Sequence, residues 1–366
     1  MAGPQRYARQ IALPELGAAG QARLRAGRVL IVGAGGLGSP AALYLAAAGV
    51  GQIGLVEFDV VDETNLQRQV MYGTPDVGRP KLEAASARLR ALNPDVRIDP
   101  HGERFSAANA LALVAAYDVV VDGTDNFPTR YLVNDACVMT RTPNVYGSVS
   151  RFDGQASVFA MPGGPCYRCL HPEPPPDGLI LSCAEGGVLG VLPGLVGMIQ
   201  ATEAIKLLTG LGEPLVGRFL LYDALRMRFR EIALARDPGC PVCGDRPEIR
   251  ELVEYAVTCE TGAMSHEPAI DMTVDDLKQW QDKKHPHFLV DVREPGEHAI
   301  GAIEGSTLIP LGQIGQRIGE LPTDKPIVVY CQVGGRSARA VAMLRAKGLN
   351  AHNLVGGFRA WEAAED

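Results

Sequence analysis

Residues 28–38 read RVLIVGAGGLG, and this stretch decides the fold of the first part of the chain. The run at 28–32 is apolar and β-branched, as in a buried strand, and the glycines that follow open an Ala- and Leu-rich helical segment at 37–48. A strand that turns through glycines into a helix presents free N–H groups and the positive end of a helix dipole to a phosphate. The stretch therefore predicts a nucleotide-binding turn, and a purely structural βα turn is the alternative.

Two further apolar runs, at 53–58 and 118–121, repeat the pattern downstream. Strands that alternate with helices predict an α/β fold, in which helices cover a Rossmann-like sheet rich in parallel strands. Glu57 lies near the end of the first run, 19 residues after Gly38. Because a carboxylate at that place can accept hydrogen bonds from ribose hydroxyls, Glu57 is a candidate nucleotide-binding residue.

Polar and cationic residues follow this acid, namely Asn65, Arg68 and Lys81, and an acidic turn, DGTDN at 122–126, ends the last apolar run. A triphosphate needs several cations, whereas a dinucleotide needs few. A carboxylate at the carboxyl end of a strand can also hold Mg²⁺. Each cation alone is compatible with an ordinary surface residue. Together they favour ATP, while the glycine pattern by itself would permit an NAD-dependent oxidoreductase.

Two C-x-x-C pairs stand far apart in the chain, Cys166 with Cys169 and Cys240 with Cys243. Each pair can bind one side of a tetrahedral Zn²⁺, and two pairs complete a closed Cys₄ site of the structural kind. A redox pair or merely buried thiols are the alternatives. Cys183 follows the proline-rich segment 172–176, and an exposed setting suits a catalytic or relay thiol that meets a large partner.

A third cysteine environment lies near the C-terminus, where an apolar run at 326–330 leads into CQVGGR at 331–336 and a helix at 337–347. This order places the Cys331 thiol at a helix N-terminus. The helix dipole and Arg336 there favour a thiolate and would stabilise a persulfide anion. A buried structural cysteine is the alternative.

Composition limits the partners and the location. The formal charge is −7 over 366 residues, without the basic excess that nucleic-acid binding requires. The first 17 residues lack the apolar core of a secretory signal, and no stretch reaches the ~18 uninterrupted apolar residues of a membrane span. We expect a cytoplasmic protein without nucleic-acid or membrane partners, whose eight cysteines are ligands or thiols rather than disulfides.

Segment 249–268 mixes polar residues and proline without periodicity, as in a linker. It predicts two domains, at 1–248 and at 269–366.

The motifs of the first domain resemble the ubiquitin-activating-enzyme-like adenylyltransferases of the molybdopterin-synthase and thiazole-biosynthesis type. The likeness covers 6 to about 245 and is carried by RYARQ (6–10), GAGGLG (33–38), TNLQRQ (64–69), GRPK (78–81) and DGTDN (122–126). In that family the two C-x-x-C pairs form a zinc site. The cysteine that matches Cys183 bonds covalently to the carrier protein.

The resemblance implies a role for each matching residue: Gly36 and Gly38 under the nucleotide, Glu57 on the ribose, Asn65, Arg68 and Lys81 on the phosphates, and Asp125, with Asn126 beside it, on Mg²⁺. Arg9 would reach the triphosphate of a neighbouring protomer, which implies a homodimer. The family usually has Asp where this chain has Glu57, and Asp59 is the alternative for ribose binding.

Residues 269–366 resemble rhodanese domains through DVRE (291–294), GAIEG (301–305), GGF (356–358) and the four residues between Cys331 and Arg336. The two resemblances imply an enzyme of sulfur-carrier chemistry, such as molybdenum cofactor biosynthesis. ATP would activate the C-terminal Gly-Gly carboxylate of a ubiquitin-like carrier, and a Cys331 persulfide would then supply sulfur. A cysteine desulfurase or thiosulfate would load that cysteine. A non-catalytic docking protein is the other alternative, although it would not need Cys331 and Arg336.

Overall fold

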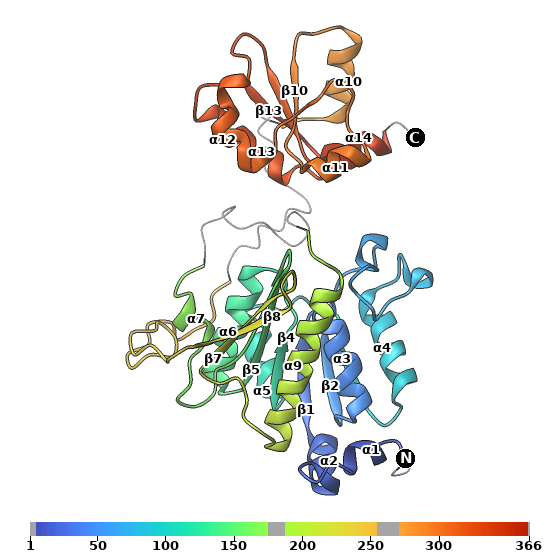
Figure 1. Cartoon of the computed structure of the whole chain (residues 1–366), viewed down its shortest axis with the longest axis vertical. Helices are drawn as coiled ribbons and strands as arrows, with labels where there is room; N and C mark the ends of the chain where they lie inside the picture. The colour runs from blue at the N-terminus through green and yellow to red at the C-terminus, as the bar shows by residue number, and fades with distance from the viewer. Residues whose placement is uncertain (1–4, 175–186, 255–270, 365–366) are drawn as a thin grey trace. The chain divides into compact units, whose positions relative to one another are not determined.

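The chain folds as two α/β units (Figure 1). The structure is a computed structural model that describes residues 5–174, 187–254 and 271–364. The units comprise Met1–Val257 and Thr258–Asp366, and each has its own sheet. The predicted fold class is confirmed. The limits of the predicted connection, 249–268, stay a prediction because most of that segment lies outside the described residues.

An eight-stranded sheet in the order β3-β2-β1-β4-β5-β6-β7-β8 forms the framework of the larger unit. Its strands are β1 (Arg28–Val32), β2 (Gln52–Val56), β3 (Arg97–His101), β4 (Val119–Asp122), β5 (Asn144–Ser150), β6 (Asp153–Phe159), β7 (Arg218–Asp223) and β8 (Arg228–Ala233). The strands from β3 to β5 pair in parallel, and β6 to β8 extend the sheet by antiparallel pairing. The parallel half is the Rossmann-like part that the sequence predicted.

Helices cover both faces of this sheet. They are α1 (Ala8–Ile11), α2 (Gly17–Ala26), α3 (Gly38–Ala48), α4 (Lys81–Leu92), α5 (Ala110–Ala115), α6 (Phe127–Thr140), α7 (Tyr167–Leu170) and α9 (Val191–Thr209), with 3-10 turns η1 (Glu63–Asn65) and η2 (Thr74–Asp76). Val29 and Ile31 of β1 pack into one core with α3, α4 and α9. Leu30 and Val32 pack into a second core with α5 and α6. Successive strand residues point to opposite faces, so β1 is buried on both sides.

The predicted strand at 28–32 and helix at 37–48 are confirmed within one residue. The helix ends at Gly49, whose φ of 83° is left-handed, a conformation that glycine adopts without steric cost. The strand β3 was missed, because Asp99 and Pro100 interrupt its apolar pattern. The run before the acidic turn is therefore the fourth strand in the chain, although it pairs directly with β1.

Among the described residues, α9 is the helix long and apolar enough to cross a membrane. Ala201 and Ala204 on this helix are buried in the first core with β1 and α3. Gln200, also fully buried, donates to the carbonyl oxygens of Asp122 and Val145. These contacts with the sheet explain its apolar composition, because α9 is a core helix of the larger unit.

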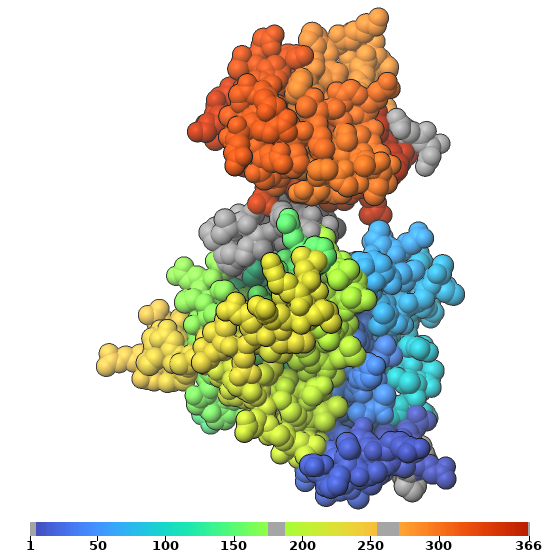
Figure 2. All heavy atoms as spheres, in the orientation of Figure 1, coloured from blue at the N-terminus to red at the C-terminus, as the bar shows by residue number. Residues whose placement is uncertain are grey.

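The strand β8 forms the outer edge of the larger sheet, and all six of its residues are exposed. Figure 2 shows the β7–β8 hairpin (yellow) on the surface of this unit, where Met227 and Phe229 are exposed. The strand also carries the charged residues Arg228, Arg230 and Glu231. Charged side chains on an edge strand oppose pairing with other chains.

The smaller unit has a five-stranded, all-parallel sheet in the order β11-β10-β12-β13-β9. Its strands are β9 (Asp271–Met272), β10 (Phe288–Asp291), β11 (Thr307–Leu308), β12 (Ile327–Tyr330) and β13 (Ala351–Leu354). Its helices are α10 (Val274–Asp282), α11 (Pro295–Ile300), α12 (Ile314–Arg317), α13 (Gly335–Arg345) and α14 (Gly357–Ala363), with 3-10 turns η3 (Leu311–Gln313) and η4 (Ile318–Glu320). Two buried clusters form its own core.

Candidate functional site

The glycine turn after β1 is packed tightly against its own backbone. Gly33 has a φ of 91° and donates its N–H to the Val56 carbonyl at 2.9 Å. A Cβ on Gly38 would collide with the carbonyl of Gly33, and one on Gly36 would lie 3.0 Å from Cβ of Pro193. Gly38 is thus required by the close approach of α3 to β1. The predicted place of both glycines under a nucleotide stays a prediction.

Glu57, which directly follows β2, holds the glycine turn through a hydrogen bond. Its buried carboxylate accepts hydrogen bonds from the N–H groups of Ala34 (3.0 Å), Phe58 (2.9 Å) and Asp59 (3.0 Å). Three backbone donors compensate its burial, since charge-assisted hydrogen bonds of this kind are strong. The side chain of Asp59 is 55% exposed. Asp59 is therefore the more accessible of the two predicted ribose-binding carboxylates, and the role of Glu57 in holding the turn was missed.

Lys81 begins α4 beside these acids. It is buried to 6% exposure, and its Nζ lies 3.2 Å from Oδ2 of Asp59. Its backbone N–H also donates to the carbonyl of Asp59 at 2.9 Å. A buried ammonium requires a counter-charge or an anionic ligand. The structure therefore brings two predicted site residues, Lys81 and Asp59, into direct contact.

Asn65 and Arg68 lie on the segment that crosses over the glycine turn. A Cβ on Gly36 would be 3.7 Å from Cγ of Arg68, so the arginine stem lies beside the turn. In the structure the Arg68 guanidinium donates to the Thr64 carbonyl at 2.9 Å. The Asn65 side chain accepts from the N–H of Asp62 at 3.4 Å and caps η1. Both side chains thus have local partners beside the expected phosphate position.

The acidic turn after β4 has one buried and one exposed carboxylate. Asp122 is fully buried, whereas Asp125 is exposed. Asn126 caps α6 by accepting from the N–H of Thr129 at 2.9 Å. Of the two carboxylates, Asp125 is therefore the one open to a metal ion, and the Asn126 oxygen has a structural use that was missed.

These elements meet at the carboxyl ends of the parallel strands. The strands β2, β1 and β4 are parallel neighbours, so their carboxyl ends carry Glu57, the glycine turn and Asp125 side by side. Arg9 belongs to α1, a helix that lies at the opposite ends of the strands (Figure 1). Its neighbour Gln10 donates to the carbonyl of Ala48, where α3 ends. Within one chain Arg9 is thus remote from the glycine turn, and its contribution to a neighbouring protomer stays a prediction.

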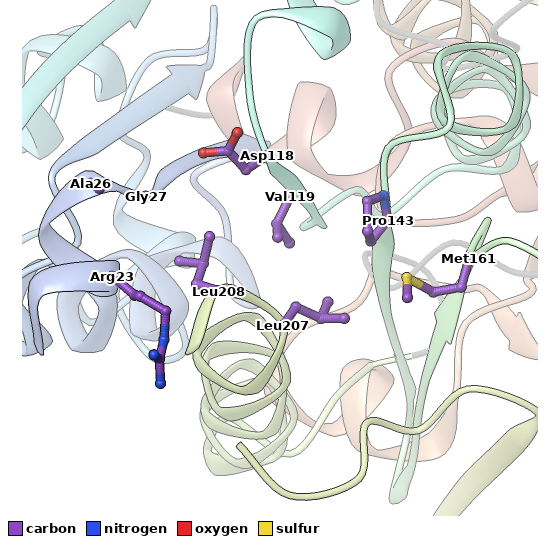
Figure 3. Close-up of a pocket in the computed structure, with 9 residues that line it drawn as sticks. All are labelled: Arg23, Ala26, Gly27, Asp118, Val119, Pro143, Met161, Leu207 and Leu208. Carbon is purple, nitrogen blue, oxygen red and sulfur yellow. The ribbon is translucent and has the colours of Figure 1, made fainter. Parts of the chain in front are cut away.

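A cavity of about 340 Å³ lies at the amino ends of β1 and β4, whereas the glycine turn follows the carboxyl end of β1. Figure 3 shows the residues that line the cavity. Gly27 and Asp118, which line it, directly precede β1 and β4. Its walls are mostly aliphatic, with Leu207 and Leu208 from α9. It shares no lining residue with the predicted nucleotide site.

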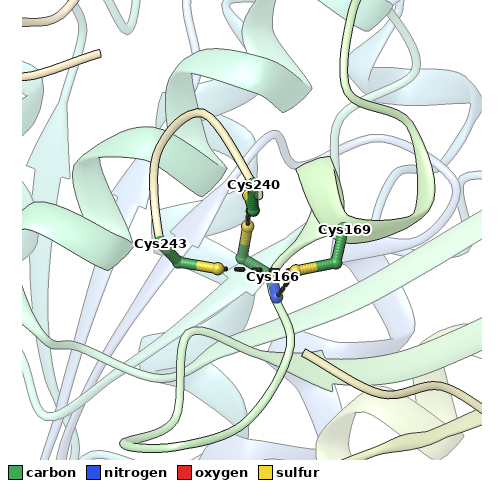
Figure 4. A group of neighbouring side chains, drawn as sticks. All are labelled: Cys166, Cys169, Cys240 and Cys243. Atoms are coloured by element: carbon green, nitrogen blue, oxygen red, sulfur yellow. Dashed lines mark hydrogen bonds between the residues drawn. The ribbon is translucent and has the colours of Figure 1, made fainter. Parts of the chain in front are cut away.

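The four paired cysteines converge on one point (Figure 4). All four sulfur atoms lie within 4.8 Å of one another, with Cys166–Cys240 at 3.5 Å and Cys169–Cys243 at 3.4 Å. These distances exceed the ~2.05 Å of a disulfide and approach the spacing around a tetrahedral zinc with Zn–S bonds of about 2.3 Å. The predicted Cys₄ cluster is confirmed as a group able to hold a metal.

The neighbouring sulfurs also adjust the ionisation of these thiols. Hydrogen bonding with Cys166 lowers the pKa of Cys240 to about 6, and a separate hydrogen bond with Cys166 lowers the pKa of Cys169. The pKa values of Cys166 and Cys243 are raised in turn. Thiolate is the form in which cysteine binds a metal ion.

A buried ion pair ties the first cysteine pair to α6. Arg168 contacts both carboxylate oxygens of Asp135 at 2.8 Å, and both residues are almost completely buried. Its guanidinium also lies 4.6 Å from the ring centroid of Tyr131. Tyr131 donates its hydroxyl to the carbonyls of His171 and Glu173. The chain that leaves the cysteine pair is therefore held on α6.

The larger unit contains two further cysteines, Cys137 and Cys183. Cys137 is buried in the core of α5 and α6, and burial raises its pKa well above the ordinary value. Cys137 is therefore a core residue. Cys183, the predicted relay thiol, lies outside the described residues.

Cys331 sits between β12 and α13 in the smaller unit, with 1% exposure. Its sulfur accepts from the N–H of Gly334 at 3.1 Å and from the hydroxyl of Ser337 at 3.5 Å. Gly334 is left-handed, with a φ of 105°, which lets the loop turn its N–H groups inward. A thiol at a helix N-terminus with two donors is the environment that the sequence predicted, although Ser337 was missed.

Arg336 has a different contact from the one expected. Its guanidinium forms two hydrogen bonds with Glu297 of α11, so this carboxylate balances its charge. Arg293 fixes the same loop from the other side by donating to the side-chain oxygen of Gln332 at 3.0 Å. Arg293 is in turn bonded to Asp291. Both contacts join residues from separate elements, which sequence reasoning did not pair.

The fold and the two cysteine environments define a two-unit protein in which a nucleotide-binding type of α/β unit precedes a rhodanese-like unit. The sequence model of the ThiF family matches residues 7–242, and that of the rhodanese-like domain matches 273–364. The chain belongs to the ThiF family and carries a C-terminal rhodanese-like domain. The predicted combination of an adenylyltransferase with a sulfurtransferase is thereby confirmed.

Curated relatives share this organisation. The chain is 49% identical to a probable adenylyltransferase/sulfurtransferase, MoeZ of Mycobacterium tuberculosis, over 97% of this chain and 92% of the relative. It is 44% identical to the adenylyltransferase and sulfurtransferase MOCS3 of Sus scrofa, over 99% and 86%. A sulfur carrier protein adenylyltransferase of Thermus thermophilus is 55% identical over 69% of this chain and 96% of the relative.

Solved structures support the fold of the larger unit. E. coli MccB determined with ATP superposes with a TM-score of 0.58 at 23% identity, covering 65% of this chain and 74% of that chain. At this identity the likeness concerns the fold alone.

Proposed function

We propose that this protein uses ATP to adenylate the C-terminal Gly-Gly carboxylate of a ubiquitin-like sulfur carrier, and then sulfurates it from a persulfide on Cys331. Two features in one chain carry the proposal. One is the buried Lys81, which pairs with Asp59 after β2. The other is Cys331, whose sulfur accepts a hydrogen bond from the N–H of Gly334 in its own loop. The named activities of the relatives MoeZ and MOCS3 support the pairing of the two reactions.

In the first reaction the carrier carboxylate attacks the α-phosphate of ATP, and pyrophosphate leaves. Positioning and neutralisation of negative charge are the main contributions of a protein to such a transfer. Lys81, Arg68 and Asn65 would contact the phosphates, and Asp59 or Glu57 the ribose. Asp125 would hold Mg²⁺, which supplies positive charge next to the transferred phosphate.

In the second reaction the terminal sulfur of the Cys331 persulfide attacks the acyl carbon, and AMP leaves. The product is an acyl disulfide between the carrier and Cys331. A second thiol, which we assign to Cys183, attacks the Cys331 sulfur, so that the carrier departs as a thiocarboxylate and a Cys183–Cys331 disulfide remains. A cellular dithiol then reduces that disulfide. The N–H of Gly334 and the hydroxyl of Ser337 would stabilise the sulfur anion at Cys331.

The other components follow from the same scheme. Zn²⁺ fits the Cys₄ cluster as a closed structural site, since the four thiols leave no open coordination position. A cysteine desulfurase or thiosulfate would load Cys331, and a homodimer would let Arg9 reach the partner's triphosphate. A cytoplasmic location suits the six free thiols of the described residues. Carriers of molybdenum cofactor biosynthesis are the first candidates, because the motifs of the first domain resemble adenylyltransferases of the molybdopterin-synthase type.

The test has two stages. ATP–pyrophosphate exchange that depends on a carrier ending in Gly-Gly measures adenylation. Mass spectrometry of the carrier after incubation with ATP and a sulfur donor measures replacement of one carboxyl oxygen by sulfur. A carrier truncated by its last two glycines is the control. Absence of exchange with a panel of such carriers would contradict the proposal.

A further inference from the structure

The buried end of β4 holds a charged pair that the proposed reaction does not use directly. Asp122 is the last residue of β4 and has 0% exposure, and Arg130 on the first turns of α6 has 6% exposure. Arg130 Nε lies 3.8 Å from Asp122 Oδ2. Neither of these two atoms has a hydrogen-bond partner among the described residues. A pair this deeply buried is costly to maintain unless it satisfies other groups.

Asp122 and Arg130 both form hydrogen bonds with Thr124, in the turn after β4. Asp122 Oδ1 accepts from the Thr124 N–H at 3.0 Å and from the Thr124 hydroxyl at 2.5 Å. Arg130 Nη2 donates to the Thr124 carbonyl at 3.1 Å and reaches the Gly147 carbonyl of β5 at 3.5 Å. Thr124 is thus held through its N–H, hydroxyl and carbonyl. The next residue is the exposed Asp125.

The surroundings keep Arg130 in this position. Its guanidinium lies 5.1 Å from the ring centroid of Tyr146 and 5.6 Å from that of Phe127, distances at which a cation is attracted to an aromatic face. From the other side of the sheet, Gln200 donates to the Asp122 carbonyl at 2.7 Å. Burial raises the pKa of Asp122, and the charge of Arg130 opposes this rise. The carboxylate and the guanidinium therefore act as one unit.

We propose that Asp122 and Arg130 are positioning residues for adenylation, which hold the turn at 123–126 so that Asp125 stands ready to bind Mg²⁺. The inference rests on the proposed function, in which Asp125 is the metal ligand. Neither residue contacts the metal or the nucleotide in this scheme. A ligand carried on an unrestrained turn would have to be ordered at each binding event, which weakens binding.

The experiment compares the Mg²⁺ dependence of carrier-dependent ATP–pyrophosphate exchange in the full chain and in the variants Asp122→Asn and Arg130→Lys. We expect each to raise the half-saturating Mg²⁺ concentration at least about tenfold at saturating ATP. The control variant is Asp135→Asn, which breaks the buried pair with Arg168 further along the same helix. We expect it to lower the melting temperature without moving the Mg²⁺ midpoint.

A double variant tests whether the pair acts as a unit. Asp122→Asn combined with Arg130→Gln leaves no unpaired buried charge, so it remains available for measurement if a single variant fails to fold. We expect its Mg²⁺ midpoint to be shifted no further than that of the worse single variant. An unchanged Mg²⁺ midpoint in folded variants of this pair would overturn the inference. Absence of exchange in the unmodified protein would instead contradict the proposed function.

Discussion

Arg336 and Glu297 form a two-pronged ion pair, with 2.7 Å from Nη1 to Oε2 and 2.6 Å from Nη2 to Oε1. The pair connects the N-terminus of α13 to α11 and so fixes the loop that begins at Cys331. Arg336 is buried, whereas the Glu297 side chain is one-third exposed. Glu297 therefore balances the charge of Arg336 within the smaller unit, without a bound sulfur donor.

Replacing Glu297 with Gln should destabilise the smaller unit. The variant keeps the volume but removes the negative charge that pairs with the buried Arg336 guanidinium, and we expect a loss of about 1–2 kcal/mol in the free energy of unfolding. Both tryptophans of the chain, Trp280 and Trp361, lie in this unit, so their fluorescence during urea unfolding reports on it alone. Glu320→Gln is the control, because its pair with Arg317 is surface-exposed and contributes little. Equal losses in both variants would contradict this account.

The stability of the smaller unit should fall at acidic pH. Hydrogen bonds from arginines lower the pKa values of Glu297 and Asp291, although burial acts in the opposite direction. A folded-state pKa below the unfolded value contributes stability above the unfolded pKa, which is lost as the pH falls through the folded pKa. We therefore expect urea midpoints, followed by tryptophan fluorescence, to decline below about pH 4. Glu297→Gln should show a shallower decline, and an unchanged slope would count against the assignment.

Cys331→Ala should separate the two reactions. We expect thiosulfate:cyanide sulfurtransfer to fall by on the order of 10³-fold or more, since the nucleophile is gone. Carrier-dependent pyrophosphate exchange should stay within about twofold, because the glycine turn belongs to the other unit. Ser337→Ala keeps the nucleophile but removes one donor to its sulfur, and we expect a loss of about tenfold. Loss of both activities in Cys331→Ala would refute the division of labour.

Removal of the metal should unfold part of the larger unit. Elemental analysis of purified protein should show about one zinc per chain. Cys240→Ser should lose that zinc and lower the melting temperature of the larger unit, because the metal joins segments about 70 residues apart and so restricts the unfolded chain. Cys137→Ala, which changes a buried thiol outside the cluster, should retain the metal. Well-folded protein without zinc would contradict the structural assignment.

Lys81→Met should impair adenylation. Loss of the buried ammonium that we propose contacts a phosphate should lower kcat/KM for pyrophosphate exchange by about 10²-fold or more. Arg79→Met is the matched control, since Arg79 stands two residues away, is exposed and pairs with Asp76. We expect it to stay within about twofold of the unmodified enzyme. Similar losses at both positions would point to a general charge effect.

Local patterns carried most of what the sequence predicted. The glycine turn, the two C-x-x-C pairs and the Cys331 loop each occupy a few consecutive residues, and the structure shows each as a folded feature. The convergence of the cysteine pairs also followed from chemistry, because Zn²⁺ needs four ligands.

Contacts between distant elements could not be predicted in the same way. Glu297 and Arg336 are 39 residues apart, and no local signal links them. Glu57 was expected to bind a ribose because of its place near the end of an apolar run, 19 residues after Gly38. Its hydrogen bonds with backbone N–H groups depend on how the glycine turn packs on β2. The exposed fraction of each acid, and not its place in the sequence, distinguishes Asp59 and Asp125 from their buried neighbours.

The helix α6 connects the acidic turn to the cysteine cluster, through Asn126 and Arg130 at its start and Asp135 further along. Successive residues of an α-helix are rotated by about 100°. Deleting one residue between Arg130 and Asp135 would therefore turn the aspartate away from Arg168 while leaving the cap in place. Relatives that keep both sites should tolerate substitutions on the outer face of this helix, but hardly any change in its length.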